Sequence, residues 1–304
     1  MIVLSLFNGM NTGRQALENV GIKIDKYYSS EIKPYAIELT QYHFPDTIQV
    51  GDVTKWREWD IDWKNIDLVL SGSPCQDLSA AGKRAGINGS KSSLFFTFIE
   101  ILEHIKSLNP NVLFLQENVG SASKLDVGIM SRALGVYPVR INSSLVTAQK
   151  RDRYYWTNIK TKETMFDIVT DIPQPNDKKI FLKDIIYFQS DNKYLSEQQI
   201  NKGILKNQAK IYHTGISMGA VNFPTNINGK SKALLTFNIL GSRETNHIKD
   251  DFGIRILNKI EMCRLQGFPD NYCDILSTAK AGSLLGDGWT LPIIEHIFSF
   301  INKC

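Results

Sequence analysis

The sequence predicts an α/β fold: a Rossmann-like, doubly wound, mostly parallel sheet with a small irregular domain attached. Short apolar runs alternate with helical patterns over residues 1–158, which is typical of parallel sheets with helices on both faces. Polar side chains follow most of the predicted strands, at the edge where such sheets bind ligands. Over residues 160–253 the alternation stops, so a separate small domain is expected there.

Turn and cap residues predict the first two strand–helix units. Residues 1–6, "MIVLSL", form the apolar run of a buried strand, and the glycine-rich turn "FNGMNTG" leads into a helix over residues 14–20. Gly21 is a natural stop for that helix. A second strand is predicted over residues 24–31. The next helix, over residues 34–43, begins with a proline, which a first turn tolerates.

The remaining strands of the sheet follow the same alternation. Short strands are predicted over residues 47–53 and 66–72, and the second of them runs into the sequence Ser-Pro-Cys-Gln. Helical periodicity over residues 94–108 precedes a buried strand over residues 111–119. Two further strands are predicted from "VRINSSLVTA" and "RYYWTNI", residues 139–148 and 153–159.

The chain is therefore predicted to have three parts. Residues 1–158 form the main domain, residues 159–253 form the insert, and residues 254–304 return to the main domain. Within the last part, residues 254–269 are predicted as a helix and turn, and residues 290–301 as a closing helix.

Composition excludes several classes of protein. The hydrophobic content of 42% and charged content of 22% are ordinary for a soluble protein, and no apolar run reaches the ~18 residues of a membrane span. The four cysteines show no C-x-x-C spacing, so a metal site is not expected and an intracellular protein is. Residues 159–253 carry 13 Lys and Arg against 10 Asp and Glu. That excess fits an anionic partner, although a solvated surface explains it as well.

Three strand ends predict a site for a nucleoside-bearing cofactor. The turn around Asn8 leads into a helix N-terminus, whose free N–H groups suit an anionic group. Glu31 ends the next strand and can accept two ribose hydroxyls, as in dinucleotide sites. Asp52, at the third strand end, can accept from an adenine amino group. Each signal alone is weak evidence for such a site, but all three occur together by chance less often than any one of them.

Four further residues suggest chemistry. Cys75 follows a proline at a strand end, where an attacking thiolate is useful, although most lone cysteines are inert. Glu117 leaves a buried strand, and a carboxyl against an apolar wall can hold a proton, although a surface carboxylate is the default. Arg151 and Arg153 are predicted on the same side of a strand. Two guanidiniums there suit a carboxylate, a phosphate or a base edge, and a salt-bridged sheet face is the alternative.

The ordered motifs "LFNGMNTG", "SEI", "GDV", "GSPCQDLS", "QENV", "QKRDR", "RLQGFPD" and "GDGWTLP" resemble the DNA (cytosine-5) methyltransferase family. The resemblance covers residues 1–158 and 254–304. The segment between them lies where that family has its variable target-recognition domain. "GSPCQDLS", "KSSLFFTF" and "GDGWTLPIIEHIF" are similar to the mammalian de novo enzymes. "QKRDR" and "RLQGFPD" are closer to bacterial restriction-modification enzymes.

The resemblance implies a fold of the S-adenosylmethionine-dependent methyltransferase type, with no metal. It implies that Cys75 attacks C6 of a flipped-out cytosine in duplex DNA, and that Glu117 supplies an acid or hydrogen bond at N3. Arg153 then holds the base carbonyl, and Arg151 orients Glu117 or a phosphate. S-adenosylhomocysteine is the product. The implied donor-binding residues are Phe7, Asn8, Gly9, Gly13, Glu31, Asp52, Pro74, Leu94, Asp287 and Trp289.

The implied DNA contacts lie mostly in the glycine-rich segment after Cys75, residues 76–93, which is expected to close over the flipped base. Residues 213–232 are expected to face a groove of the DNA. Two positions depart from the family: Asn8 where relatives often have Asp, and Asp287 where many bacterial members have Asn. An acid beside the donor's own carboxylate disfavours a carboxylated donor, since like charges repel. The implied DNA contacts are Gln76, Ser79, Lys83, Arg84 and Lys91.

Three alternatives remain open at this point. An RNA methyltransferase of the same family would carry a Cys-Phe-Thr sequence, which is absent. A catalytically dead DNA-binding module would not need the full set of catalytic residues. A Rossmann-type oxidoreductase would need G-x-G-x-x-G, which "FNGMNTG" does not form. The protein is expected to be a cytoplasmic, nucleoid-associated monomer of a bacterium or phage-infected cell. It is either an orphan enzyme or the partner of a restriction endonuclease on a separate chain.

Overall fold

The protein is seen in a computed structural model, and its chain forms two compact units. The first comprises Met1–Asn142, Asp152–Pro175 and Leu291–Cys304, and the second comprises Ser143–Arg151 and Asn176–Thr290. The predicted boundaries fall elsewhere, because most of the C-terminal segment packs within the second unit and only its last helix belongs to the first. The structure describes residues 1–74, 93–188, 192, 194–201, 224–236 and 246–301.

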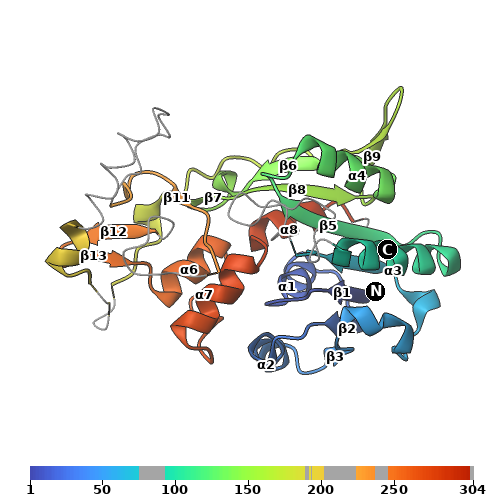
Figure 1. The fold of residues 1–304 in the computed structure, drawn as a ribbon, viewed down its shortest axis with the longest axis horizontal. Helices are drawn as coiled ribbons and strands as arrows, with labels where there is room; N and C mark the ends of the chain where they lie inside the picture. The colour runs from blue at the N-terminus through green and yellow to red at the C-terminus, as the bar shows by residue number, and fades with distance from the viewer. Residues whose placement is uncertain (75–92, 189–191, 193, 202–223, 237–245, 302–304) are drawn as a thin grey trace. The chain divides into compact units, whose positions relative to one another are not determined.

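A seven-stranded sheet forms the centre of the first unit (Figure 1). Its first five strands are parallel to one another. The sixth runs antiparallel to the strands on either side of it. The predicted doubly wound, mostly parallel sheet is therefore confirmed. In spatial order the strands are β3 (Ile48–Gln49), β2 (Lys26–Ser30), β1 (Ile2–Leu6), β4 (Leu68–Ser71), β5 (Leu113–Val119), β8 (Asp152–Thr157) and β6 (Val139–Asn142).

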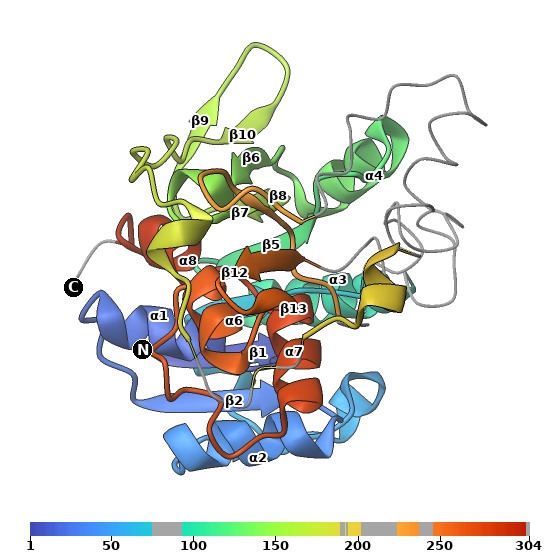
Figure 2. The ribbon, with the colours of Figure 1, turned by 90° about the vertical axis from the view of Figure 1, so that its left-hand side faces the viewer.

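Helices cover both faces of this sheet. Successive side chains of a strand point to opposite faces, so Val69 and Leu70 of β4 mark the two sides. On the side of Val69, α3 (Ser93–Leu108) packs its apolar face into a hydrophobic core cluster. On the side of Leu70 lies α1 (Thr12–Asn19). The closing helix α8 (Leu291–Phe298) packs beside α1, as Figures 1 and 2 show.

Helix α2 (Pro34–His43) has the predicted bounds, but two other helices were missed by the sequence reading. Helix α4 (Lys124–Leu134) is capped by Ser123, whose hydroxyl accepts the N–H of Asp126 at 3.1 Å. Helix α7 (Thr278–Asp287) is capped by Ser277 in the same way. Glycine and serine inside both helices weaken the helical pattern, although the serine caps were visible in the sequence.

The prediction of one strand over residues 139–148 was wrong for the second half of that range. Strand β6 ends at Asn142, a short 3-10 turn follows over Ser143–Leu145, and the chain passes into the second unit. There the two-residue strands β7 (Gln149–Lys150) and β11 (Ser231–Lys232) pair in parallel. The chain returns to the first unit at the start of β8.

The prediction of a helix and turn over residues 254–269 was wrong for the first residues, which form a strand. Strand β13 (Gly253–Ile256) pairs antiparallel with β12 (His247–Asp250), and α6 (Lys259–Gln266) follows. Asn258 and Glu261 form a capping box that fixes the first turn of α6. The N-x-x-E spacing of a capping box was present in the sequence.

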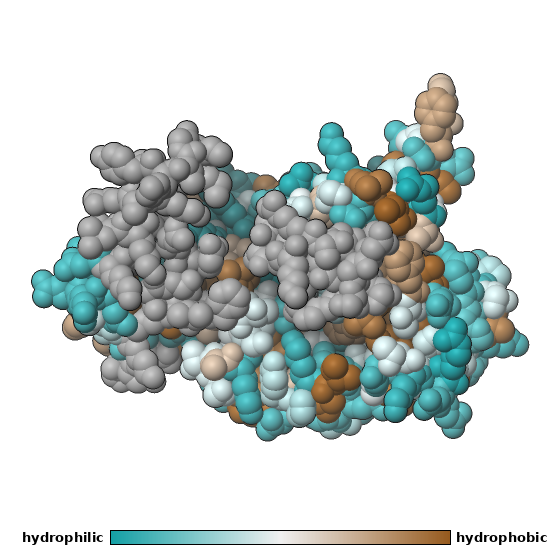
Figure 3. Space-filling view, viewed as in Figure 1, coloured by the Kyte–Doolittle hydropathy of each residue, from teal (hydrophilic) through white to brown (hydrophobic). Residues whose placement is uncertain are grey.

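A short hairpin of β9 (Thr161–Glu163) and β10 (Ile168–Thr170) extends from the first unit. Its tip exposes Met165 and Phe166, which are 87% and 86% accessible. The apolar tip stands out at the upper right of Figure 3 against a mostly polar surface. Among the described residues, no helix is long and apolar enough to cross a membrane.

The tight packing of α1 on the sheet predicts the effect of a substitution at Gly13. A Cβ at this position would lie 2.4 Å from Cδ1 of Leu70 and 3.2 Å from the hydroxyl of Tyr27. Both neighbours are buried, so Gly13→Ala should destabilise the protein by about 1–3 kcal/mol through overpacking. Urea denaturation followed by circular dichroism measures the loss. Gly128→Ala is the control, because its nearest neighbour, Arg132, is 3.5 Å away; an equal loss in both variants would contradict the prediction.

Candidate functional site

Hydrogen bonds tie the turn after β1 to the end of β2. The N–H of Asn8 donates to the carbonyl of Ser30 at 3.1 Å. The N–H of Gly9 donates to the carboxylate of Glu31 at 2.8 Å. That carboxylate also accepts the N–H groups of Ile32 and Lys33, at 2.8 and 2.9 Å. A carboxylate offers about four lone-pair positions, so Glu31 is held in place and keeps about one acceptor position, fewer than two ribose hydroxyls would fill.

The turn itself has an unusual backbone. Phe7, Gly9 and Asn11 all have positive φ angles, of 55°, 58° and 64°, in a region that glycine favours and asparagine tolerates but that strains a bulky residue such as Phe7. Asn11 is fully buried, yet neither polar atom of its carboxamide has a hydrogen-bond partner among the described residues. A ligand or ordered water normally satisfies such a group. Asn11 was not selected from the sequence.

Asn8, a predicted cofactor residue, has partners inside the fold. Its Oδ1 accepts the hydroxyl of Tyr27 at 3.3 Å, and its Nδ2 donates to the hydroxyl of Thr40 at 3.4 Å. Burial raises the pKa of Tyr27, so the tyrosine remains a donor at neutral pH. Since both neighbours are hydroxyls that can donate, an Asp at this position would also be accommodated. Gly13 packs against the sheet and has a steric role.

The end of β3 presents Asp52. Its Oδ1 accepts the N–H and the hydroxyl of Thr54, both at 2.9 Å. The hydrogen bond from the Thr54 amide lowers the pKa of Asp52, so the exposed carboxylate is charged at neutral pH. The hydroxyl of Ser30 donates to the carbonyl of Gly51 at 2.7 Å, which joins the ends of β2 and β3. Asp52 is thus a fixed acceptor at the same edge as Glu31.

Glu117 and Arg153 form an ion pair across β5 and β8. Glu117 is opposite Tyr155 and Val119 is opposite Arg153, so the two charged residues are diagonal neighbours on one face of the sheet. Oε1 of Glu117 lies 2.7 Å from Nε of Arg153, with 11% and 16% of the side chains exposed. The structure therefore brings these two predicted residues together in a mostly dehydrated setting.

A second contact places the end of β4 beside that pair. Nε2 of Gln116 donates to the hydroxyl of Ser73 at 3.0 Å, and Ser71 of β4 is opposite Gln116 of β5. Pro74, the last described residue of this segment, therefore follows β4 at the same edge as Glu117. Leu94, another predicted residue, lies in the first turn of α3 and packs partly buried against the core. Gln116 and Ser73 were not selected from the sequence.

The sequence predicted Arg151 and Arg153 on the same side of one strand, but the structure does not place Arg151 in a strand. It lies between β7 and β8 and belongs to the second unit. Its guanidinium donates to the carbonyls of Leu234 at 3.2 Å, Gly286 at 3.0 Å and Gly288 at 2.8 Å. The residue is 3% exposed. Arg151 thus binds backbone that lies more than 80 residues away in sequence.

Two buried glutamines extend this network within the second unit. Nε2 of Gln149 donates to Oε1 of Gln266 at 2.9 Å, and Gln266 donates in turn to the carbonyls of Leu285 and Gly288. The hydroxyl of Thr290 donates to the same Oε1 at 2.9 Å. The motifs "QKRDR", "RLQGFPD" and "GDGWTLP" are therefore joined by side-chain hydrogen bonds. The two predicted residues of the last motif differ in exposure: Asp287 is exposed and Trp289 is partly buried.

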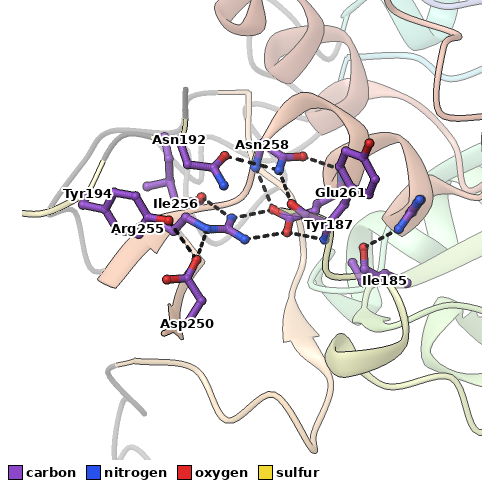
Figure 4. A network of polar contacts seen from close by, with 10 residues as sticks. Ile185, Tyr187, Asn192, Tyr194, Asp250, Arg255, Ile256, Asn258 and Glu261 are labelled. Atoms are coloured by element: carbon purple, nitrogen blue, oxygen red, sulfur yellow. Dashed lines mark hydrogen bonds and ion pairs between the residues drawn. The ribbon is translucent and has the colours of Figure 1, made fainter. Parts of the chain in front are cut away.

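A buried ion-pair network organises the start of α6 (Figure 4). Nη1 and Nη2 of Arg255 donate to the two carboxylate oxygens of Glu261, at 2.8 and 2.9 Å. Nε of Arg255 donates to Asp250 at 2.6 Å. Glu261 also accepts the N–H groups of Tyr187 and Asn258. Burial would lower the pKa of Arg255, but its bonds to Glu261 and Asp250 outweigh burial and raise that pKa. These charges hold the β12–β13 hairpin against the helix.

One lysine of the predicted groove-facing segment is used inside the second unit. The ammonium of Lys230 donates to the carbonyls of Ser144, Thr147 and Ile180, at 2.6, 3.1 and 2.5 Å. Three bonds exhaust its donors, and burial lowers its pKa. Lys230 is therefore a structural residue, and residues 213–223 of the same segment lie outside the described residues.

Several predicted residues cannot be placed. The predicted nucleophile Cys75 and all five predicted DNA contacts lie outside the described residues. Across the described ranges, which leave out residues 75–92, no group of three or more His, Cys, Asp or Glu residues could hold a metal ion. The residues concerned are Cys75, Gln76, Ser79, Lys83, Arg84 and Lys91.

The first unit has an α/β fold with a mostly parallel seven-stranded sheet, and Glu31, Asp52 and the Glu117–Arg153 pair lie toward the carboxyl edge of its parallel strands. The chain belongs to the family of C-5 cytosine-specific DNA methylases, whose model matches residues 1–303. By class it is a DNA (cytosine-5) methyltransferase. The type II methyltransferase M.HpaII of Haemophilus parainfluenzae is 28% identical, over 96% of this chain and 86% of the relative. M.HhaI of Haemophilus parahaemolyticus is 25% identical, over 97% and 92%.

Solved structures agree with the fold. The crystal structure of S. pombe Dnmt2 methyltransferase superposes with a TM-score of 0.67 at 16% identity, covering 99% of this chain and 98% of that one. A putative DNA modification methyltransferase encoded within an E. coli prophage gives a TM-score of 0.62 at 18% identity, covering 99% and 98%. These likenesses establish the architecture alone.

The network of Figure 4 predicts a loss of stability in acid. Burial opposes the charge of Asp250, but hydrogen bonds from Arg255 outweigh it and lower the pKa of Asp250. The resulting stability is present above the unfolded pKa of about 3.9 and is lost as the pH falls through the lower folded value. Asp250→Asn should lower the melting temperature at pH 7 and reduce its drop between pH 5 and pH 3. Asp251→Asn, exposed at the same turn, is the control and should keep the wild-type drop.

Proposed function

We propose that this enzyme transfers a methyl group from S-adenosylmethionine to C5 of a cytosine flipped out of duplex DNA. The observation that carries the proposal is the ion pair of Glu117 and Arg153, 2.7 Å apart beside the end of β4. It supplies a carboxyl and a guanidinium at the point where Cys75 follows Pro74 in the sequence. Family membership supports the same reaction.

The reaction needs a nucleophile because C5 of cytosine is itself a poor one. The thiolate of Cys75 forms a bond to C6, and the electron pair of the C5–C6 double bond becomes available at C5. Glu117 supplies a proton or hydrogen bond at N3, and Arg153 orients Glu117 and binds the base carbonyl. After transfer, C5 loses its proton, the double bond re-forms and the thiolate of Cys75 leaves.

The donor site is proposed at the carboxyl edge of the sheet. S-adenosylmethionine supplies a methyl group on a positively charged sulfur. The fixed carboxylate of Glu31 accepts a ribose hydroxyl, and Asp52 accepts from the adenine amino group. Ile32 is 68% exposed and offers apolar surface for the adenine ring. The carboxamide of Asn11, which has no hydrogen-bond partner among the described residues, suits a polar group of the donor or a water molecule bound to it. The other proposed donor contacts are Phe7, Asn8, Gly9, Pro74, Leu94, Asp287 and Trp289.

The partner is proposed to be duplex DNA, contacted by the segment after Cys75. Reaching C5 and C6 requires the base to leave the helix, and the lysines, arginine and glycines of residues 76–93 suit phosphate contacts and closure. The type II names of the relatives support a restriction endonuclease on a separate chain. The protein is proposed to act as a monomer in the cytoplasm, where it associates with the cellular DNA.

The function is tested with labelled donor and either duplex DNA or RNA. Wild-type protein should label DNA only. Cys75→Ser should lower transfer by at least ~10³-fold, because removing a nucleophile costs most of the catalysis. Glu117→Gln should lower it by ~10²–10⁴-fold. A 5-fluorocytosine duplex should trap a covalent adduct through Cys75, since C5 then has no proton to lose. Label on RNA but not on DNA would exclude the proposed substrate.

The role of Glu31 is tested by donor binding. Glu31→Gln replaces one acceptor oxygen by an NH₂ group that faces backbone N–H donors, so the Kd for S-adenosylmethionine should rise ~10–100-fold. Calorimetry with the donor and with its 2′-deoxy and 3′-deoxy analogues measures the change. Wild type should discriminate against at least one analogue, and the variant should discriminate less. Unchanged discrimination would show that Glu31 does not contact the ribose.

A further inference from the structure

We propose that Arg151 is a positioning residue for the methyl-donor site. It holds in shape the loop Gly286–Trp289, whose first two residues are the last two of helix α7. This role replaces the expected one of orienting Glu117 or a phosphate. The inference rests on the proposed function, because the family resemblance is what assigns Asp287 and Trp289 of this loop to the donor. Its physical basis lies entirely within the second unit.

The contacts of Arg151 make it a clamp on two segments of backbone. Its planar guanidinium has five N–H donors in a fixed fork, and three carbonyls accept from it at 2.8–3.2 Å. One carbonyl belongs to Leu234, and the other two belong to Gly286 and Gly288. With 3% of the residue exposed, water cannot readily replace the bonds to Leu234 and Gly286, which are buried, so their loss would cost the desolvation penalty of those carbonyls.

The loop packs directly against the backbone of Leu235, next to Leu234, so the two backbone segments that Arg151 joins are in close contact. A Cβ on Gly286 would lie 2.3 Å from both the carbonyl carbon and the carbonyl oxygen of Leu235. Helix α7 ends at Asp287, and the last carbonyls of a helix lack partners within it. A cation placed there also suits the negative end of the helix dipole. Arg151 therefore supplies both the missing donors and the favourable charge.

Fixing the two glycine carbonyls fixes the side chains between and beside them. Asp287 lies between Gly286 and Gly288, and Trp289 follows directly. Gln266 adds a second bond to the carbonyl of Gly288 at 3.3 Å, so the two clamping residues converge on one peptide group. Loss of Arg151 should let this peptide group turn, which displaces both side chains. Donor affinity should then fall, while the chemical step at saturating donor is largely kept.

The test compares Arg151→Met, Arg151→Lys and Arg264→Met. Arg264 is a matched control, because it also binds a carbonyl of the second unit, that of Ile185 at 3.1 Å, and an acidic partner, Asp270. Calorimetry gives the Kd for S-adenosylmethionine without DNA, steady-state kinetics separate kcat from the donor KM, and hydrogen exchange follows the amides of residues 285–290 in donor-free protein. Circular dichroism confirms that each variant is folded.

We expect Arg151→Met to raise the donor Kd and KM at least ~10-fold, as loss of hydrogen bonds to a charged group does, with kcat within about threefold of wild type. Exchange at residues 285–290 should accelerate. Arg151→Lys, which keeps the charge but loses the fork, should recover part of the affinity and of the protection. Arg264→Met should resemble wild type in all three measurements.

Two results would overturn the inference. A large loss of kcat with an unchanged donor Kd would indicate that Arg151 orients Glu117 or a phosphate, as the family resemblance implies. Unchanged exchange at residues 285–290 in Arg151→Met would show that the loop does not need the clamp. If the wild-type protein binds no S-adenosylmethionine, the proposed function fails and the donor role of Arg151 fails with it. If it binds the donor and the variant binds equally well, this inference alone fails.

Discussion

The antiparallel pairing of β8 with β5 is the interaction on which the rest of the site depends. It places Arg153 diagonally across from Glu117 on one face of the sheet. Because β5 is also parallel to β4, the same pair lies at the edge where the chain leaves β4 for the predicted nucleophile. A one-residue change of register would turn either charged side chain to the other face, so the strand pairing itself specifies the ion pair.

Backbone hydrogen bonds to side chains do most of the remaining positioning. The carboxylate of Glu31 accepts hydrogen bonds from three backbone N–H groups and thereby ties the turn after β1 to the end of β2. The guanidinium of Arg151 donates hydrogen bonds to three backbone carbonyls in the second unit. In both cases a charged group satisfies backbone that the local secondary structure leaves unpaired. Such residues set the shape of loops that regular structure cannot hold.

Much of the fold could be predicted from hydrophobic pattern and turn residues. All five strands of the parallel part were found, because buried parallel strands are continuous apolar runs. Helices α4 and α7 were missed, because internal glycines weaken the helical signal. The antiparallel insertion of β8 between β5 and β6 had no local signal, because it depends on which strands pair. For the proposed site, the sequence selected Glu31, Asp52 and Glu117 as polar residues at predicted strand ends, and the structure places them just after β2, after β3 and within β5. Asn11 and Gln116 were not, since only burial reveals that their amides matter.

The sequence by itself determined the fold class and the family, through the order of motifs at the ends of predicted strands. It also identified which carboxylates and arginines could take part, because residue type limits the chemistry. Tertiary structure alone decided their partners. Arg151 and Arg153 are two residues apart and similar in the sequence, yet Arg153 pairs with Glu117 and Arg151 binds the carbonyls of Gly286 and Gly288. The reason is physical: the partners come from distant parts of the chain, and only packing brings them within hydrogen-bond reach.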